Sequence, residues 1–396
     1  MKKQLYLLLI FILIFSACKA KPGVEARREI IDGIEYIYNT KTPLYPKRTL
    51  SFEEELAIDP EDDEVNIILF RPRSFVVGPN ENIYITDIQD NAIKVFDPNG
   101  KYKLTIGRRG QGPGEFQSIG YQAFLPDGRF LVMDSRQKRT SLFDSSGKFL
   151  ESFKWEESLG LLYLATNSSL ILKKYTFGGK NNPLEDRKLF IREYDFAGSE
   201  INSFGEFKDE KTRIYTIGRA AVLLASPYPP MSIFAGDLER QQLYHMVNNE
   251  YIIEVYDRTG KVIRKIERPY EPVPFTRQDA QEYLARYKEG SKMRKAVEAM
   301  STPKVKTITT RMLIDDRGNL WVETFEKKEE EDQVLKAYDI FSADGSYEAK
   351  VWLDKDPAII LKEKMYLMET NEETGFSVVK RYRLVWKELE EKTLQD

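Results

Sequence analysis

Cysteine and histidine are nearly missing from this 396-residue chain, which holds one of each, Cys18 and His245. A single thiol excludes an internal disulfide and a cysteine-rich zinc cluster, and a single imidazole excludes a metal site built from several histidines. One histidine also leaves little scope for a serine triad, and the sequence contains no Gly-x-Ser-x-Gly motif. We therefore expect no catalytic residues, no metal ligands and no cofactor.

An excess of basic residues is missing as well. Lys and Arg number 60 and Asp and Glu 63, so the formal net charge is -3. A dedicated nucleic-acid-binding protein normally carries a clear positive excess, so we expect no nucleic-acid partner. Hydrophobic residues make up 41% of the chain and aromatic residues 12%, which is enough for one large core or two medium ones.

The first residues have the pattern of an export signal. The basic residues Lys2 and Lys3 precede an unbroken apolar run, Leu5–Phe15, and small residues lead to Cys18. Eleven apolar residues are too few to cross a hydrocarbon core of about 30 Å, so the run predicts a signal peptide rather than a transmembrane helix. The end of the run resembles a bacterial lipobox, which implies cleavage before Cys18 and lipid attachment to its sulfur. The alternative is an ordinary secretory signal that leaves a stray cysteine.

The lipobox resemblance has consequences for the domain organisation. We expect residues 1–17 to be removed, residues 18–45 to form a tether and N-terminal extension, and residues 46–390 to form the folded domain. A polar stretch over residues 19–28 would hold that domain off the membrane. The expected location is the cell envelope, outside the cytoplasm, at the outer membrane or on its periplasmic side.

A turn pattern recurs along the chain. Each copy has an apolar and aromatic strand end, then Asp (Ser in one copy), two spacer residues and Gly. The copies are Asp97–Gly100, Asp144–Gly147, Asp195–Gly198, Asp257–Gly260 and Ser342–Gly345. Asp caps its own turn and Gly supplies a positive φ, so each copy predicts a tight hairpin. The first two spacings, 47 and 51 residues, are typical of β-propeller blades.

Short alternating segments surround these turns where a four-stranded blade requires strands. In the first unit the predicted strands are Phe75–Gly78, Ile83–Asp87, Ala92–Phe96 and Lys101–Ile106, and later units centre on 121–153, 160–205, 230–268 and 307–353. A sixth unit over residues 357–387 lacks a fourth strand. Thr49–Ala57 is strand-like and has no blade of its own, so we expect it to complete that blade and close the ring. The predicted fold is an all-β, six-bladed β-propeller with four-stranded blades.

The link after the first unit carries a more specific signal. Ile106–Phe116 contains Gly-Pro-Gly-Glu-Phe and follows Ile83–Asp87 and Val95–Asp97. This combination resembles an NHL-type repeat, and the chain from Cys18 onward is similar to the six-bladed propeller lipoproteins of bacterial envelopes. The resemblance implies the fold strongly and a function only weakly.

One region departs from strand periodicity. Residues 276–300 are rich in helix-forming residues, and Tyr283, Tyr287, Met293 and Val297 can share one helix face. We expect a helical insertion, either packed on the propeller rim or serving as a lid or docking helix.

Distinctive polar residues gather on one predicted face of the propeller. In an antiparallel blade, the turn between strands two and three and the link to the next blade lie on the same side, opposite the Gly turns. The candidate binding residues on that side are Asp87, Gln89, Arg108, Arg109, Gln111, Asp134 and Arg136. The competing interpretation is structural: an Asp after a strand usually closes its own turn, and the glycines only steer the chain. A phosphate loop is excluded because Gly-Lys-Ser/Thr is absent and a strand follows.

The remaining candidates have structural interpretations. The acidic runs Glu53–Glu55, Glu61–Glu64 and Glu329–Asp332 lack the alternating spacing of a calcium loop and are interpreted as solvated loop charge. His245, in an apolar strand, is interpreted as a packed side chain. The sequence therefore favours a non-catalytic envelope module that binds a protein, peptide or glycan, or a scaffold. The alternative is an enzyme resembling propeller lactonases or NHL-type lyases, with a metal on the axis.

Overall fold

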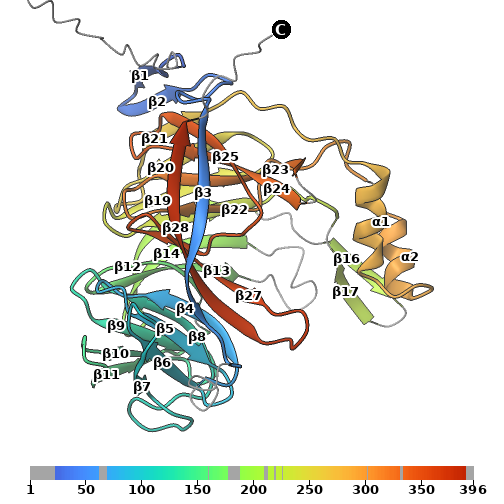
Figure 1. Ribbon diagram of the computed structural model, residues 1–396. Coiled ribbons are helices and arrows are strands. Elements are labelled where there is room, and N and C mark those ends of the chain that lie inside the picture. The colour runs from blue at the N-terminus through green and yellow to red at the C-terminus, as the bar shows by residue number, and fades with distance from the viewer. Residues whose placement is uncertain are drawn as a thin grey trace, which may run out of the picture.

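The computed structural model describes residues 23–61, 69–158, 160–176, 188–208, 213–217, 220–224, 226–300, 302–330 and 333–388. In these residues, six antiparallel sheets form a ring of blades (Figure 1). Blade 1 holds β4 (Pro72–Val77), β5 (Ile83–Asp87), β6 (Ala92–Phe96) and β7 (Tyr102–Ile106). Blade 2 holds β8 (Ile119–Phe124), β9 (Phe130–Asp134), β10 (Arg139–Phe143) and β11 (Phe149–Lys154). Blade 3 holds β12 (Leu161–Ala165), β13 (Ser169–Thr176), β14 (Lys188–Asp195) and β15 (Glu200–Phe207).

The other three blades follow the same order. Blade 4 holds β18 (Ser232–Asp237), β19 (Gln242–Val247), β20 (Ile252–Tyr256) and β21 (Val262–Glu267). Blade 5 holds β22 (Arg311–Ile314), β23 (Leu320–Glu330), β24 (Gln333–Phe341) and β25 (Tyr347–Leu353). Blade 6 holds β26 (Ile359–Leu361), β27 (Lys364–Thr370), β28 (Ser377–Glu388) and the N-terminal strand β3 (Arg48–Ile58). The predicted six-bladed propeller is confirmed.

The first strand of each blade is the innermost, and inner strands of neighbouring blades contact one another, as β18 does β22 and β12 does β18. Because strands alternate in direction, the propeller has two distinct faces. The Gly-turn face carries the turns from strand one to two and from strand three to four. The link face carries the turns from strand two to three and the links between blades.

The recurring turns require an Asp that caps the turn and a Gly that fits a crowded position. Asp97 Oδ1 accepts hydrogen bonds from the backbone N of Asn99 and of Lys101, both at 2.9 Å. Gly345 has a φ of +90°, which favours glycine, and a Cβ there would lie 2.7 Å from Cδ1 of Ile37 at the outer edge of the preceding blade. The glycine therefore permits both the turn and the close packing of successive blades.

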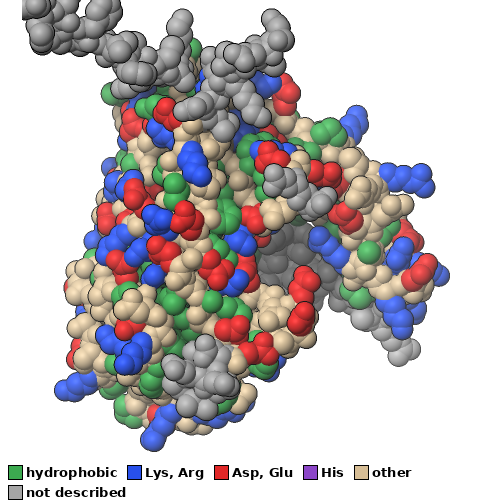
Figure 2. Space-filling model, viewed as in Figure 1, with side chains coloured by type: hydrophobic (Ala, Val, Ile, Leu, Met, Phe, Trp, Pro, Cys, Tyr) green, Lys and Arg blue, Asp and Glu red, His purple; other side chains and the backbone are tan. Residues whose placement is uncertain are grey.

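Strand β3 closes the ring as predicted. It pairs antiparallel with β28 from Arg48 opposite Glu388 to Ile58 opposite Val379. The acidic run Glu53–Glu55 lies in this strand and faces basic residues of β28, with Glu53 paired to Arg383, Glu54 to Lys380 and Glu55 to Arg381. The interpretation of this run as loop charge was wrong, because cross-strand ion pairs hold it in the sheet. Figure 2 shows acidic and basic side chains intermixed over β3 and β28.

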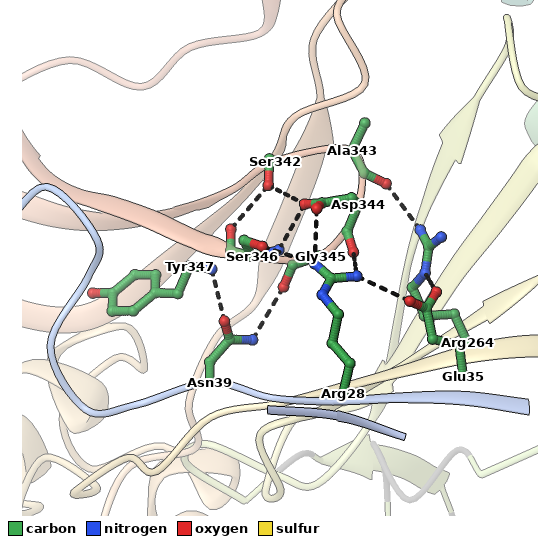
Figure 3. A network of polar contacts seen from close by, with 10 residues as sticks. All are labelled: Arg28, Glu35, Asn39, Arg264, Ser342, Ala343, Asp344, Gly345, Ser346 and Tyr347. Atoms are coloured by element: carbon green, nitrogen blue, oxygen red, sulfur yellow. Dashed lines mark hydrogen bonds and ion pairs between the residues drawn. The ribbon is translucent and has the colours of Figure 1, made fainter. Parts of the chain in front are cut away.

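A hairpin before β3 extends blade 4. It consists of β1 (Arg27–Ile31) and β2 (Ile34–Tyr38), and β2 pairs in parallel with β21. Figure 3 shows how polar contacts fasten it to blade 5: Arg28 Nη2 lies 2.8 Å from Oδ2 of Asp344, and Asn39 Oδ1 accepts from Tyr347 N at 2.7 Å. Leu44 N then donates to Tyr347 O at 2.9 Å on the way to β3. The N-terminal segment thus contacts blades 4, 5 and 6 in turn. The tether predicted over residues 19–28 already meets the folded part at Gly23, whose N donates to Leu44 O at 2.7 Å.

The predicted helical insertion contains two short helices, α1 (Arg277–Ala285) and α2 (Lys292–Glu298). Gly290, with a φ of +70°, lies in the break between them. Tyr283, Tyr287 and Val297 pack together across the helix pair, whereas Met293 is exposed, so one continuous helix face was not the right geometry. The insertion leaves the link face next to the hairpin of β16 (Arg213–Ile217) and β17 (Ala220–Leu224) (Figure 1). No helix of the described chain has the length and apolar character needed to cross a bilayer.

Candidate functional site

The seven candidate residues on the link face separate into two groups. Asp87 and Asp134 are fully buried. Asp87 accepts from the backbone N of Phe70 at 2.6 Å and of Gln89 at 2.9 Å, and Asp134 accepts from that of Gln117 at 2.6 Å. Each carboxylate therefore ties the link that enters its blade to the turn that follows its own strand. Asp87 and Asp134 were predicted to contact a ligand, but their carboxylates accept hydrogen bonds from the backbone and are buried, so a ligand cannot reach them.

The glycine-rich link between blades 1 and 2 has a structural core and an exposed outside. Phe116 is fully buried between the blades and packs against Gly107, where a Cβ would lie 2.2 Å from its ring. Glu115 accepts from Gly112 N at 2.9 Å and from Arg108 Nε at 2.7 Å, and these bonds hold the pKa of Glu115 below its ordinary value. The link is therefore an ordered loop rather than a flexible one.

The other five candidate residues are exposed on the outside of this loop and the adjoining turns. They are Gln89, Arg108, Arg109, Gln111 and Arg136. Arg109 Nη2 donates to the backbone O of Gln89 at 2.8 Å, which joins the link to the turn of blade 1. All five belong to the blade link and to the turns from strand two to three, which the sheet order places on the link face.

A second site lies on the propeller axis and was not foreseen from the sequence. A cavity of about 520 Å³ is lined by every inner strand of the ring. The contributing residues are 76–79, 121–124, 162, 163, 165, 236–239, 314–316 and 359–361. In each blade these positions lie at or near the end of the first strand, so the cavity belongs to the Gly-turn half of the axis.

The wall of the axial cavity is mainly apolar. Aliphatic side chains such as Ile314 and Ile359 line it together with the rings of Phe124, Tyr121 and Tyr163. Burial raises the pKa of Tyr163, so its phenol stays a neutral hydrogen-bonding group at physiological pH. Apolar walls with a few polar groups are typical of ligand-binding cavities.

Polar atoms are few in the cavity and are placed at its wall and rim. Gln122 Nε2 donates to Tyr84 O at 3.3 Å, whereas its buried Oε1 has no hydrogen-bond partner in the part of the chain described. Four carboxylates border the opening: Asp237, Glu239, Asp315 and Asp316. Asp315 is fully engaged by the backbone N of Arg317 and of Asn319.

These rim carboxylates do not form a metal site. Among the described residues, no group of three or more His, Cys, Asp or Glu side chains is arranged to hold a metal ion.

The single histidine lies between blades 3 and 4. Its Nε2 is 3.0 Å from Ser232 Oγ, and its Nδ1 is 3.5 Å from Glu254 Oε2. This order of groups matches a serine triad, but Ser232 is only 3% exposed and His245 6%, with the rings of Phe207 and Phe234 against the imidazole. A substrate cannot reach the serine, so the contacts make His245 a packed side chain, as the sequence interpretation had it.

Glu254 beside this histidine makes stability depend on pH. The His245 contact, followed by hydrogen bonds from Lys265 and Tyr256, holds the pKa of Glu254 at about 2, although burial opposes this. A carboxyl whose pKa is lower in the folded state stabilises the fold above its ordinary pKa of 4.5, and that stability is lost as the pH falls toward 2. We expect Glu254→Gln to flatten the decline of unfolding free energy over this range.

Urea unfolding at a series of pH values tests this expectation. The difference between the original chain and Glu254→Gln should shrink as the pH falls from 4.5 to 2.5. Glu239→Gln, at an exposed side chain, serves as the matched control and should leave the pH profile unchanged. Parallel profiles for all three chains would contradict the role assigned to Glu254.

Comparisons with known proteins agree with the observed architecture. A family model described as a 6-bladed beta-propeller, DUF5128, matches residues 74–218. This match spans blades 1 to 3 and the link that follows. The protein is a six-bladed β-propeller. No curated protein matches the chain.

Solved structures extend the likeness over most of the propeller. A member of the DUF4221 family from Bacteroides vulgatus is 14% identical, with 86% of this chain and 99% of that chain covered at a TM-score of 0.51. A protein from Bacteroides fragilis, described as exported, is 11% identical, with coverage of 88% and 99% and a TM-score of 0.46. Virginiamycin B lyase from Staphylococcus aureus is 10% identical, with coverage of 85% and 100% and a TM-score of 0.35. At 14% identity the first likeness shows the fold alone.

Proposed function

We propose that this propeller is a non-catalytic binding module of the cell envelope, and that its axial cavity binds an apolar segment of a protein or peptide. The observation that carries the proposal is the cavity itself, because all six inner strands contribute to a mainly apolar wall. Hydrogen-bonded blades on every side hold that wall in place. A preformed cavity of this kind binds without a large ordering cost.

The chemistry of the wall favours a peptide over a glycan. Leu162, Ile314 and Ile359 offer aliphatic contacts, which suit side chains such as Leu, Ile or Phe. Exposed carboxylates at the rim, such as Glu239, favour a Lys or Arg next to the apolar residues.

Selection from a library of random peptides tests this proposal. The target is the chain from Lys19 onward, which keeps every described residue. We expect enrichment of peptides that place two or more large apolar residues beside a Lys or Arg. The same selection against Ala123→Phe, which puts a ring into the cavity, should not enrich them. Failure to enrich any peptide, or equal enrichment by the filled variant, would overturn the proposal.

We also propose that the protein is anchored to the envelope by lipid on Cys18. The support is the apolar run Leu5–Phe15 and the position of the chain's single cysteine directly after Ser16-Ala17. Residues 1–22 lie outside the described residues. Because β1 begins at Arg27, only a short stretch separates the anchor from the folded domain.

Replacing Cys18 with Ser should release the protein from membranes. A serine offers no sulfur for diacylglycerol transfer, so we expect the variant to move from the membrane fraction to the soluble or uncleaved fraction and to lose label from an alkyne fatty acid. The released propeller should keep its unfolding midpoint. Unchanged labelling of the serine variant would contradict the anchor at this position.

A further inference from the structure

Five exposed arginines lie at the link-face side of blades 1 and 2, and we name them together the arginine face: Arg71, Arg73, Arg108, Arg109 and Arg136. The contacts of their own backbones bring them together. Arg71 N donates to Asp87 Oδ2 at 3.3 Å, and the turn after Asp87 accepts a hydrogen bond from Arg109 through the backbone O of Gln89. Arg136 N donates to Asp134 Oδ1, whose carboxylate also holds the end of the link that carries Arg108.

Among the described residues, most of these arginines have no carboxylate partner. Arg108 forms an ion pair with Glu115 at 2.7 Å. Arg109 donates to a backbone carbonyl, which positions its guanidinium without neutralising it. The side chains of Arg71, Arg73 and Arg136 have no hydrogen bond or ion pair within the described ranges. The buried carboxylates of Asp87 and Asp134 already accept bonds from several backbone N–H groups, so they do not turn toward these arginines.

A basic surface of this kind is unexpected on a chain with a net charge of -3. These five exposed arginines come from three segments of two neighbouring blades. Guanidinium groups present parallel N–H donors that match carboxylate and sulfate groups in bidentate fashion. The arrangement therefore suits a ligand with anionic groups repeated along its length.

We infer that the arginine face binds an anionic polysaccharide, a chain of sugars that carries carboxylate or sulfate groups at regular intervals. A polymer can engage several arginines at once, and each further contact then forms at high effective concentration. A membrane surface fits less well, because Tyr121 is the one large apolar side chain described as exposed near these arginines, and it lines the axial cavity. The axial cavity belongs to the Gly-turn half of the axis, whereas the arginines belong to the link-face side, and Arg73, whose charge acts on Tyr121 of the cavity wall, is the arginine nearest to the cavity lining.

Calorimetric titration with heparin fragments and with hyaluronate tests this inference on the chain from Lys19 onward. We expect binding whose affinity falls steeply as NaCl rises, because ion release drives the contact. The variant Arg71→Glu, Arg109→Glu, Arg136→Glu should lose at least about tenfold in affinity. Ala123→Phe should bind the polysaccharides normally, which separates this inference from the proposed peptide site.

A matched control makes the same change in net charge on the Gly-turn face. Lys101, Lys148 and Lys261 are exposed beside Gly turns, and their replacement by Glu should change polysaccharide affinity by less than about twofold. If the triple arginine variant does not fold, Arg136→Gln replaces it, because that side chain holds no described contact, and it should weaken binding measurably. Equal loss in the lysine control would overturn the inference. So would the absence of polysaccharide binding, or tighter binding of a DNA oligomer or of phosphatidylglycerol vesicles.

Discussion

A chain that begins at residue 59 is expected not to fold. It lacks β3, so the whole length of β28 becomes an unpaired edge and Ile58, which is 1% exposed, leaves the core of blade 6. An open edge of twelve residues is a template for aggregation. Circular dichroism and size-exclusion chromatography should find an aggregated or non-cooperative protein.

The register of β3 provides a sharp control for this truncation. Arg48 lies opposite Glu388, so a short turn can join the end of β28 to the start of β3. A circular permutant running from residue 69 to 388, then through such a turn to residues 46–61, should fold. A chain that begins at Thr40 removes β1 and β2 but keeps β3, and it should fold with a lower unfolding midpoint. Cooperative folding of the chain from residue 59, or failure of the permutant, would contradict closure by β3.

Replacing Asp339 with Ala is expected to cost about 3–5 kcal/mol of unfolding free energy, because it leaves a buried cation without its partner. Asp339 is fully buried in β24 and accepts from Arg268 Nη1 at 2.8 Å, Tyr251 OH at 2.8 Å and Tyr347 OH at 2.7 Å. The guanidinium of Arg268 is 4% exposed, so water cannot replace the carboxylate. Burial raises the pKa values of Tyr251 and Tyr347, and both phenols remain neutral donors.

Urea unfolding of a second variant separates the charge effect from simple loss of packing. Removing both charges, with Arg268→Met and Asp339→Leu, should recover at least about 1 kcal/mol relative to Asp339→Ala. A cost below about 1 kcal/mol for Asp339→Ala would contradict the account of this cluster. So would a double variant less stable than the single one.

Local signals made much of the fold predictable. The Asp-x-x-Gly turns depend on a side-chain cap and a positive φ, which act within four residues, and Asp97–Gly100 forms the expected hairpin. Closure by residues 49–57 followed from counting strands, since one blade lacked a fourth and one strand lacked a blade. The packed state of His245 followed from its apolar neighbours.

Features that depend on distant residues were not predictable in this way. The parallel pairing of Glu35 with Arg264 joins segments far apart in the chain and has no local motif. The axial cavity draws one short stretch from each of six blades, so Tyr163 and Ile314 meet only after the ring closes. The one available signal was that the lining residues occupy the same position, at the end of the first strand of each blade. That signal can be used only after the strands of every blade have been aligned with one another.

The affinity of an enriched peptide for four chains tests the central claim most directly. The chains are the original, Ala123→Phe, the exposed control Ala299→Phe and the triple arginine variant. If the peptide binds in the axial cavity, Ala123→Phe alone should raise the dissociation constant by at least about tenfold, since the added ring occupies the cavity. Equal affinity for the original and Ala123→Phe, or a loss confined to the arginine variant, would contradict binding in the axial cavity.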